Sequence, residues 1–191
     1  CGEDKLHGAF DFTFTHCKWD ASAFRKIIKN VEQNSQEAGF WPTYVLNNHD
    51  VERSASRFGL GEYDERLKEA AVLLILLRGT PYIYYGEEIG MRETKLKKSE
   101  IMDPVGVMWA PFNRGRDGCR APMQWNNQTN AGFTSGTPWN KVHPDYPERN
   151  VNAMVHDPNS LLTFYRQLIG LRKQFRCLQV GNLELFDQKN E

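Results

Sequence analysis

The chain has 191 residues, which is enough for one sizeable domain with a hydrophobic core of its own. Its 24 lysines and arginines balance its 24 aspartates and glutamates, so the sequence argues against a nucleic acid or an acidic membrane surface as partner. The longest apolar run, residues 70–77, is far shorter than the roughly 20 residues that span a bilayer.

The first predicted elements are a strand and a helix. Residues 6–14 are expected to form a strand or an extended segment, and their alternation places three aromatic residues on one face. These residues are Phe10, Phe12 and Phe14. Asp20 is a suitable N-cap for the helix, apolar residues recur behind it at helical spacing, and Gly39 closes the unit.

The second predicted strand, Tyr44–Leu46, is followed at once by a polar cluster. The cluster consists of Asn47, Asn48, His49 and Asp50. Four consecutive side chains that form hydrogen bonds do not contribute to a hydrophobic core, so the cluster predicts a binding site.

A second helix is expected over about residues 63–78, with a charged first half and an apolar, buried second half. Gly79 is well placed as its C′ residue. Residues 80–86 then have the β-branched and aromatic character of a buried strand, and Glu87 and Glu88 follow them. This order of strands and helices predicts a parallel sheet, with its functional edge at the carboxyl ends of the strands.

Periodicity disappears over residues 91–156, which contain Trp109, Trp125, Trp139 and most of the prolines. Because low charge and tryptophan are unusual in disordered segments, we expect a packed lid. A last helix is predicted to open with Asp157 as N-cap and Pro158 at its first position and to fade by residue 175. From about residue 177 the chain is expected to begin another, β-type unit.

The four cysteines are widely spaced and form no Cys/His pattern typical of zinc. They are Cys1, Cys17, Cys119 and Cys177. Buried free thiols and the disulfides of a secreted protein both remain open. The triplet Asn127-Gln128-Thr129 would mark a surface loop, and a glycosylation site, if the protein is secreted.

Taken alone, the His49–Asp50 pair permits several chemistries. A metal site would need further ligands at compatible spacing, and none is evident in the sequence. A Ser-His-Asp hydrolase would need a nucleophile elbow such as G-x-S-x-G, which the sequence lacks. A purely structural pair at the end of a strand is the remaining alternative.

Five longer motifs follow one another along the chain and decide between these alternatives. They are NNHDVERSASRFG, LRGTPYIYYGEEIGM, CRAPMQW, NAGFTSGTPW and FYRQLIGLRK. Together they resemble the α-amylase superfamily of glycoside hydrolases, and within it the maltase/α-glucosidase and oligo-1,6-glucosidase branch, especially its insect-type members. The resemblance extends from about Phe10 to Phe175.

The resemblance implies an α/β fold, namely the later part of a (β/α)8 TIM barrel followed by the start of a C-terminal β-domain. Residues 1–176 would belong to the barrel, with the lid at about 91–156, and residues 177–191 would open the β-domain. Residues 6–14 would lie at or just after the sixth strand of the barrel, Tyr44–Leu46 would be the seventh strand, and Tyr82–Tyr85 would be the eighth. Since the sequence begins at Cys1 without an initiator methionine, we expect a fragment of a longer protein.

Enzymes of this branch use a retaining mechanism with three carboxylates. Asp50 matches the third of them, which stabilises the transition state, while His49 and Arg120 match residues that bind the same sugar. The resemblance places the nucleophile and the acid/base before residue 1, so the isolated chain is expected to be inactive. It assigns Glu87 and Glu88 a structural role.

The expected substrate is an α-linked oligosaccharide or a disaccharide such as sucrose, with glucose released from the non-reducing end. No cofactor or metal is expected, and no calcium ligand set is recognisable. The resemblance implies an extracellular protein, secreted or held to a membrane only by an anchor outside this chain. The main alternative is a non-catalytic heavy-chain subunit of an amino-acid transporter; such subunits typically lose the His-Asp signature, whereas His49 and Asp50 are present here. A sucrose- or trehalose-directed enzyme and a binding-only role also remain open.

Overall fold

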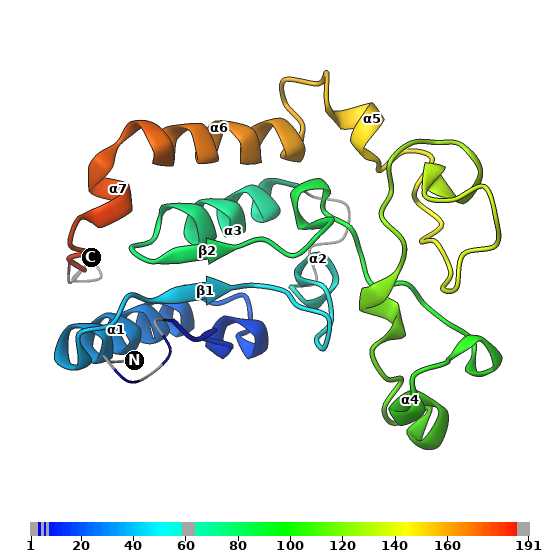
Figure 1. Cartoon of the computed structure of the whole chain (residues 1–191), viewed down its shortest axis with the longest axis horizontal. Helices are drawn as coiled ribbons and strands as arrows, with labels where there is room; N and C mark the ends of the chain where they lie inside the picture. The colour runs from blue at the N-terminus through cyan, green and yellow to red at the C-terminus, as the bar shows by residue number, and fades with distance from the viewer. Residues whose placement is uncertain (1–3, 5, 7, 59–63, 187–191) are drawn as a thin grey trace.

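The computed structural model describes residues 4, 6, 8–58 and 64–186 (Figure 1). Two parallel strands, β1 (Thr43–Val45) and β2 (Thr80–Tyr82), pair with Tyr44 opposite Pro81. On the other edge of β1, Asp11 forms an isolated parallel bridge with Tyr44. The predicted order of parallel, helix-connected segments is therefore present.

The first segment differs from its prediction, because its three aromatic residues do not all share a face. Phe14 is buried, whereas Phe10 and Phe12 are about half exposed. The Asp11 carboxylate accepts a hydrogen bond from the Thr13 backbone N–H (2.8 Å), and the chain turns there into the 3-10 helix η1 (Thr13–His16). This turn ends the alternation and carries Phe14 into the core.

The first long helix, α1 (Ala21–Ala38), confirms the predicted start and stop signals. The Asp20 carboxylate accepts a hydrogen bond from the Ala23 backbone N–H at 2.8 Å, as expected of an N-cap. Gly39 follows the helix with a φ of +66°, a left-handed conformation that glycine adopts without steric cost.

A short helix that was not predicted, α2 (Ser54–Arg57), follows the polar cluster. The next helix, α3, spans Asp64–Leu76. Its predicted start near residue 63 and the end of the preceding loop fall within 59–63, outside the described residues. Most of its apolar half is buried as expected, because α6 (Leu161–Gln174) packs along it (Figure 1), whereas Val72 is exposed.

Gly79 is not the C′ residue of α3, which ends three positions earlier. Its φ is +140°, and a Cβ at this position would lie 2.8 Å from the Tyr44 ring and 2.9 Å from the Pro42 carbonyl oxygen. The glycine is therefore required where the chain enters β2 and passes close to β1.

The strand predicted over residues 80–86 is shorter than expected and is not buried. β2 ends at Tyr82, which is 44% exposed. One face of the sheet packs against the helices, while the other carries Phe10, Phe12 and Tyr82 at the surface of the described chain. After the strand, Gly86 turns the chain with a φ of +80° into the 3-10 helix η2 (Glu87–Ile89).

The long segment without periodicity is ordered and projects beyond the carboxyl ends of the strands (Figure 1). It has a small core of its own around Met91, Ala121 and Met123. Its helical turns are η3 (Lys98–Glu100), α4 (Pro104–Trp109), η4 (Asp117–Arg120), η5 (Thr129–Gly132) and α5 (Val151–Met154).

The helix predicted to start at residue 157 is α6, which begins at Leu161 with Ser160 as its N-cap. The Ser160 hydroxyl oxygen accepts a hydrogen bond from the Thr163 backbone N–H at 3.2 Å. The carboxylate of Asp157 instead accepts one from the Asn159 N–H (2.8 Å), so this aspartate forms a turn ahead of the helix.

The tail also differs from its prediction, because a short helix, α7 (Arg176–Val180), replaces the expected strand. The chain makes a new helical turn after Phe175, where the Leu178 N–H donates to the Phe175 carbonyl oxygen at 3.1 Å. Residues 181–186 contain no strand, and residues 187–191 lie outside the described range. A β-domain from residue 177 onward therefore remains a prediction.

The main core lies between α1, α3, α6 and the inward face of β1. Its largest buried members are Phe14, Tyr44, Leu46, Leu74, Ile75 and Leu161. In the part of the chain that the structure describes, no helix combines the length and the hydropathy needed to cross a membrane.

Candidate active site

The polar cluster after β1 divides into a buried part and an exposed part. Asn47 is buried and donates hydrogen bonds to the Ser54 hydroxyl (2.9 Å) and to Glu87 Oε2 (2.5 Å). The Tyr165 hydroxyl donates to the other oxygen of Glu87 at 3.0 Å. Burial raises the pKa of Glu87 to about 7. Asn47 and Glu87 thus join β1, η2 and α6, the structural role expected of this glutamate.

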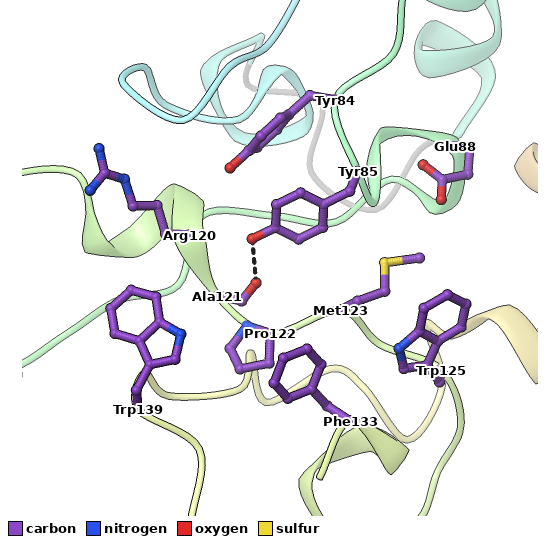
Figure 2. Close-up of a pocket in the computed structure, with 10 residues that line it drawn as sticks. All are labelled: Tyr84, Tyr85, Glu88, Arg120, Ala121, Pro122, Met123, Trp125, Phe133 and Trp139. Carbon is purple, nitrogen blue, oxygen red and sulfur yellow. Dashed lines mark hydrogen bonds between the residues drawn. The ribbon is translucent and has the colours of Figure 1, made fainter.

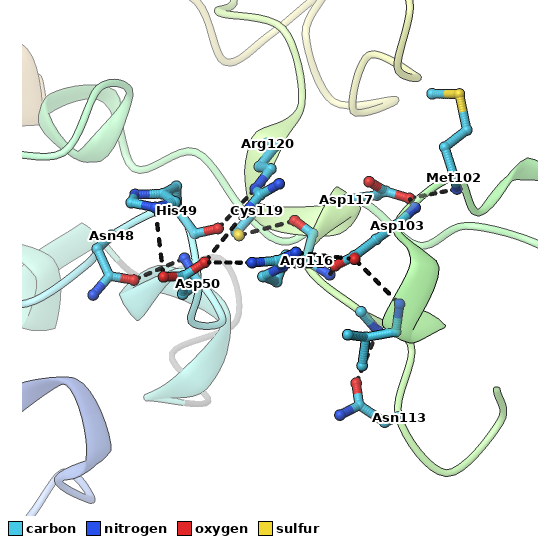
Figure 3. A network of polar contacts seen from close by, with 12 residues as sticks. Asn48, His49, Asp50, Met102, Asp103, Asn113, Arg116, Asp117, Cys119 and Arg120 are labelled. Carbon is cyan, nitrogen blue, oxygen red and sulfur yellow. Dashed lines mark hydrogen bonds and ion pairs between the residues drawn. The ribbon is translucent and has the colours of Figure 1, made fainter. Parts of the chain in front are cut away.

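The exposed part of the cluster brings Asp50 to the surface. Its backbone N–H donates to Asn48 Oδ1 at 2.8 Å, which closes a turn at the end of the strand. The Asp50 side chain is 49% exposed, and His49 Nε2 lies 3.4 Å from its Oδ2 atom (Figure 3).

Arg120 reaches this turn from the long segment. Its Nη2 atom lies 3.1 Å from Asp50 Oδ1, and its Nε donates to the His49 carbonyl oxygen at 2.8 Å (Figure 3). The structure therefore brings together the three predicted site residues, which lie up to 71 positions apart in the sequence. Their catalytic and binding roles remain predictions.

Two tyrosines after β2 fix the backbone on either side of Arg120. The Tyr84 hydroxyl donates to the Cys119 carbonyl oxygen (3.3 Å), and the Tyr85 hydroxyl donates to that of Ala121 (2.7 Å; Figure 2). Buried Arg53 lies 5.0 Å from the centroid of the Tyr84 ring and 4.7 Å from that of Tyr85. These contacts hold the rings and, through them, the segment that presents Arg120.

A second arginine, which the sequence reasoning missed, also contacts Asp50. Arg116 Nη1 lies 3.2 Å from Asp50 Oδ1, and Arg116 also pairs with the buried carboxylate of Asp103 at 2.7 Å. The available signal was the RDGCR stretch, which places a second arginine four positions before Arg120.

Two adjoining cavities border this cluster. The smaller has a volume of about 270 Å³ and lies against Phe10, Phe12, Tyr82 and the His49–Asp50 turn. The larger, about 540 Å³, is an aromatic pocket that shares Tyr84 with the smaller one and is also lined by Arg120 (Figure 2). Its other aromatic members are Tyr85, Trp125, Phe133 and Trp139.

Glu88 borders the aromatic pocket. One of its carboxylate oxygens is buried and makes no hydrogen bond to the described residues, and burial raises the pKa of the group. Its acidity is thus perturbed, but Glu88 does not line the smaller cavity, which His49 and Asp50 border.

The remaining candidates for chemistry are accounted for within the described residues. These contain no group of three or more His, Cys, Asp or Glu side chains arranged to hold a metal ion. Cys17, Cys119 and Cys177 are free thiols there, the first two buried, while Cys1 lies outside the described range. Asn127 of the glycosylation triplet is exposed in a bend.

Comparison with known proteins agrees with this arrangement. The family described as "Alpha amylase, catalytic domain" matches residues 4–181. The oligo-1,6-glucosidase of Parageobacillus thermoglucosidasius is 40% identical over 187 residues, which cover 87% of this chain and 33% of that protein.

Solved structures of related enzymes are also similar to this chain. The alpha-glucosyl transfer enzyme XgtA superposes with a TM-score of 0.83 at 31% identity, covering 91% of this chain and 32% of the enzyme. An isomaltulose synthase mutant from Erwinia rhapontici NX5, solved with its natural substrate sucrose, superposes with a TM-score of 0.75 at 37% identity over 84% of this chain and 32% of that one. The chain thus spans about a third of the length of the relatives it matches.

Proposed function

The chain belongs to the alpha-amylase family, and from this premise we propose that the protein containing it is a retaining α-glucosidase. The observation that carries the proposal is the setting of Asp50. An exposed carboxylate at the carboxyl end of β1 lies between His49 and two guanidinium groups and lines the smaller of the two cavities. In α/β barrels, catalytic groups gather at this end of the strands.

The proposed chemistry follows from the charge of Asp50. Glycoside hydrolysis passes through an oxocarbenium-like transition state, in which the sugar ring becomes positively charged. A fixed anion close to the ring stabilises that charge more than it stabilises the neutral substrate, and this difference lowers the barrier. His49 and Arg120 would donate hydrogen bonds to sugar hydroxyls and hold the ring against Asp50.

The other two carboxylates of a retaining mechanism are assigned to no residue of this chain. Glu87 is buried among Asn47, Ser54 and Tyr165, and Glu88 faces the aromatic pocket, so neither lies beside Asp50. Since the chain spans about a third of its relatives, we propose that it corresponds to the later part of the barrel and that the nucleophile and the acid/base belong to the earlier part.

We further propose that the substrate is an α-linked oligosaccharide or sucrose, cleaved to release glucose from its non-reducing end. The names of the relatives support this class, since they include an oligo-1,6-glucosidase and an isomaltulose synthase with sucrose as its natural substrate. The aromatic pocket supports it as well, because its volume of about 540 Å³ suits a small ligand and its aromatic faces suit the C–H faces of sugar rings.

The proposal is tested by assaying the complete protein with paired p-nitrophenyl α- and β-glucosides. We expect turnover of the α-glucoside alone, with glucose appearing first as the α-anomer in proton NMR spectra, as retention requires. First release of β-glucose would refute the retaining mechanism. Absence of turnover would refute the enzyme and favour the non-catalytic transporter-subunit alternative.

An extracellular location, secreted or membrane-anchored, is also proposed on the basis of the family. The exposed Asn127 of the Asn127-Gln128-Thr129 triplet supports it, because such triplets are glycosylated only on the secretory route. Detection of the protein in the cytosolic fraction alone, without any glycan, would contradict this location.

A further inference from the structure

One oxygen of the Asp50 carboxylate has two cationic partners (Figure 3). Arg116 Nη1 lies 3.2 Å from Oδ1, and Arg120 Nη2 lies 3.1 Å from the same atom. The other oxygen, Oδ2, faces His49. The two arginines have different further partners. Arg120 donates a hydrogen bond to the His49 carbonyl oxygen, whereas Arg116 pairs with a second carboxylate.

That second carboxylate is Asp103, whose side chain is almost fully buried. Its Oδ2 accepts hydrogen bonds from the Arg116 backbone N–H (2.8 Å) and from Nε (2.7 Å), and its Oδ1 accepts one from Nη2 (3.1 Å). These hydrogen bonds from Arg116 hold the pKa of Asp103 well below its usual range. The forked contact fixes both the position and the plane of the guanidinium group.

The loop around this ion pair is built tightly. Asp117 Oδ2 accepts hydrogen bonds from the backbone N–H groups of Met102 (2.6 Å) and Asp103 (2.8 Å), which closes the base of the loop. Gly115 has a φ of +73°, and a Cβ there would lie 2.9 Å from Asp103 Oδ2. The backbone can therefore press against the carboxylate only because residue 115 is glycine.

All three nitrogens of the Arg116 guanidinium group contact protein carboxylates. Nε and Nη2 contact Asp103, and Nη1 contacts Asp50. Because Asp103 holds the guanidinium group, Arg116 can fix the position of the Asp50 side chain. The guanidinium group is planar, so the direction of each of its hydrogen bonds is also fixed.

We propose that Asp103 and Arg116 are positioning residues of the glycosidase reaction: the buried carboxylate fixes the guanidinium, which fixes Oδ1 of Asp50 relative to the sugar ring. This inference rests on the proposed function and deepens it. Arg116 acts through Asp50, so its loss removes stabilisation of the transition state more than binding of the substrate. A displacement of a catalytic group by about 1 Å can cost about 100-fold in rate.

The experiment measures kcat and KM of the complete protein for p-nitrophenyl α-glucoside in Arg116→Ala, Arg116→Lys and the control Arg114→Ala, which removes an exposed arginine two residues earlier. We expect kcat to fall about 10- to 100-fold in Arg116→Ala with KM changed less than about threefold, and to remain normal in the control. Added guanidinium ion should restore part of the lost kcat in Arg116→Ala and none in Asp50→Asn. Arg116→Lys should be intermediate, because one ammonium group cannot reproduce the forked contact.

The outcomes separate this inference from the proposed function. A wild-type protein without α-glucosidase activity would remove the proposed function itself. An active wild type with a normal kcat in Arg116→Ala, or with a higher KM alone, would overturn the positioning role and leave the glucosidase assignment intact. If Arg116→Ala does not fold, Arg116→Lys decides in its place, and a normal kcat in that folded variant would overturn the inference.

Discussion

Two carboxylates follow the two strands of the sheet, and their surroundings give them opposite tasks. Asp50 is half exposed and lies between guanidinium groups, so it remains available to a charged transition state. Glu87 is buried and receives its hydrogen bonds from an amide and a phenol. Both residues are carboxylates that follow a strand of the sheet. Their surroundings make Asp50 available for catalysis and make Glu87 part of the structural core.

The environment of Glu87 predicts a pH dependence of stability. Its folded pKa of about 7 exceeds the roughly 4.3 of an unfolded glutamate, so the folded state binds more protons between these values. The free energy of unfolding should therefore decrease as the pH rises through this window, by up to about 1.4 kcal/mol per pH unit for this one group. In Glu87→Gln this contribution should vanish, as urea denaturation of the complete protein at pH 5 to 8 would reveal. The control Glu65→Gln, at an exposed position, should keep the wild-type slope; an equally steep decrease in Glu87→Gln would exclude this glutamate as its source.

The aromatic pocket predicts a chain-length effect. Trp139 borders the pocket and is 57% exposed, whereas Trp109 has nearly the same exposure, 58%, and lies in α4 outside the pocket. We expect Trp139→Ala to lower kcat/KM for a glucose trisaccharide about tenfold, equivalent to about 1.4 kcal/mol, while turnover of p-nitrophenyl α-glucoside changes little. Trp109→Ala should leave both substrates unaffected. Equal losses on both substrates in Trp139→Ala would argue against a separate sugar position in this pocket.

At the scale of elements, the sequence predicted the ends of a helix correctly where one nearby residue determines them. Asp20 caps α1 and Gly39 ends it, as predicted. The predictions that Asp157 is an N-cap and Gly79 a C′ residue were wrong. Asp157 accepts a hydrogen bond from the N–H two residues ahead, and Gly79 is required because a neighbouring strand passes close to it. The sequence alone does not distinguish these uses, since the deciding partner of Gly79 lies on β1.

Two glycines give opposite predictions for stability. Gly170 lies within α6, and a Cβ there meets no atom within 4 Å, so Gly170→Ala should stabilise the protein by about 0.5–1 kcal/mol. Gly79→Ala should destabilise it by more than about 1 kcal/mol, because the positive φ and the Tyr44 ring exclude a side chain. Thermal unfolding of the two variants should shift Tm in opposite directions. A lower Tm for Gly170→Ala would show that α6 does not tolerate the added methyl group as described.

At the scale of the whole molecule, the motifs sufficed to predict which distant residues meet. His49, Asp50 and Arg120 were named from the resemblance, and the structure brings them together. Arg116 and Asp103 were missed because their role depends on the closed loop around Gly115, which no periodic pattern announces.

The open sheet predicts how the 191 residues behave by themselves. Phe10, Phe12 and Tyr82 lie exposed on one face of a short parallel sheet, an arrangement that is stable in barrels because further strands cover it. The isolated chain should fold poorly, bind a hydrophobic dye and show no turnover of p-nitrophenyl α-glucoside, whereas the complete protein should be active. Turnover by the isolated chain would contradict the proposed location of the nucleophile and the acid/base.

Asp50 carries the charge that the proposed mechanism requires. The decisive measurement is kcat/KM of the complete protein for p-nitrophenyl α-glucoside in Asp50→Asn, which preserves the size of the side chain and removes its charge. Asp157→Asn, in the turn ahead of α6, serves as the control. We expect a loss of at least about 100-fold in Asp50→Asn, with an unchanged circular dichroism spectrum and a normal rate in the control. A rate within a few-fold of wild type in a folded Asp50→Asn protein would contradict the account.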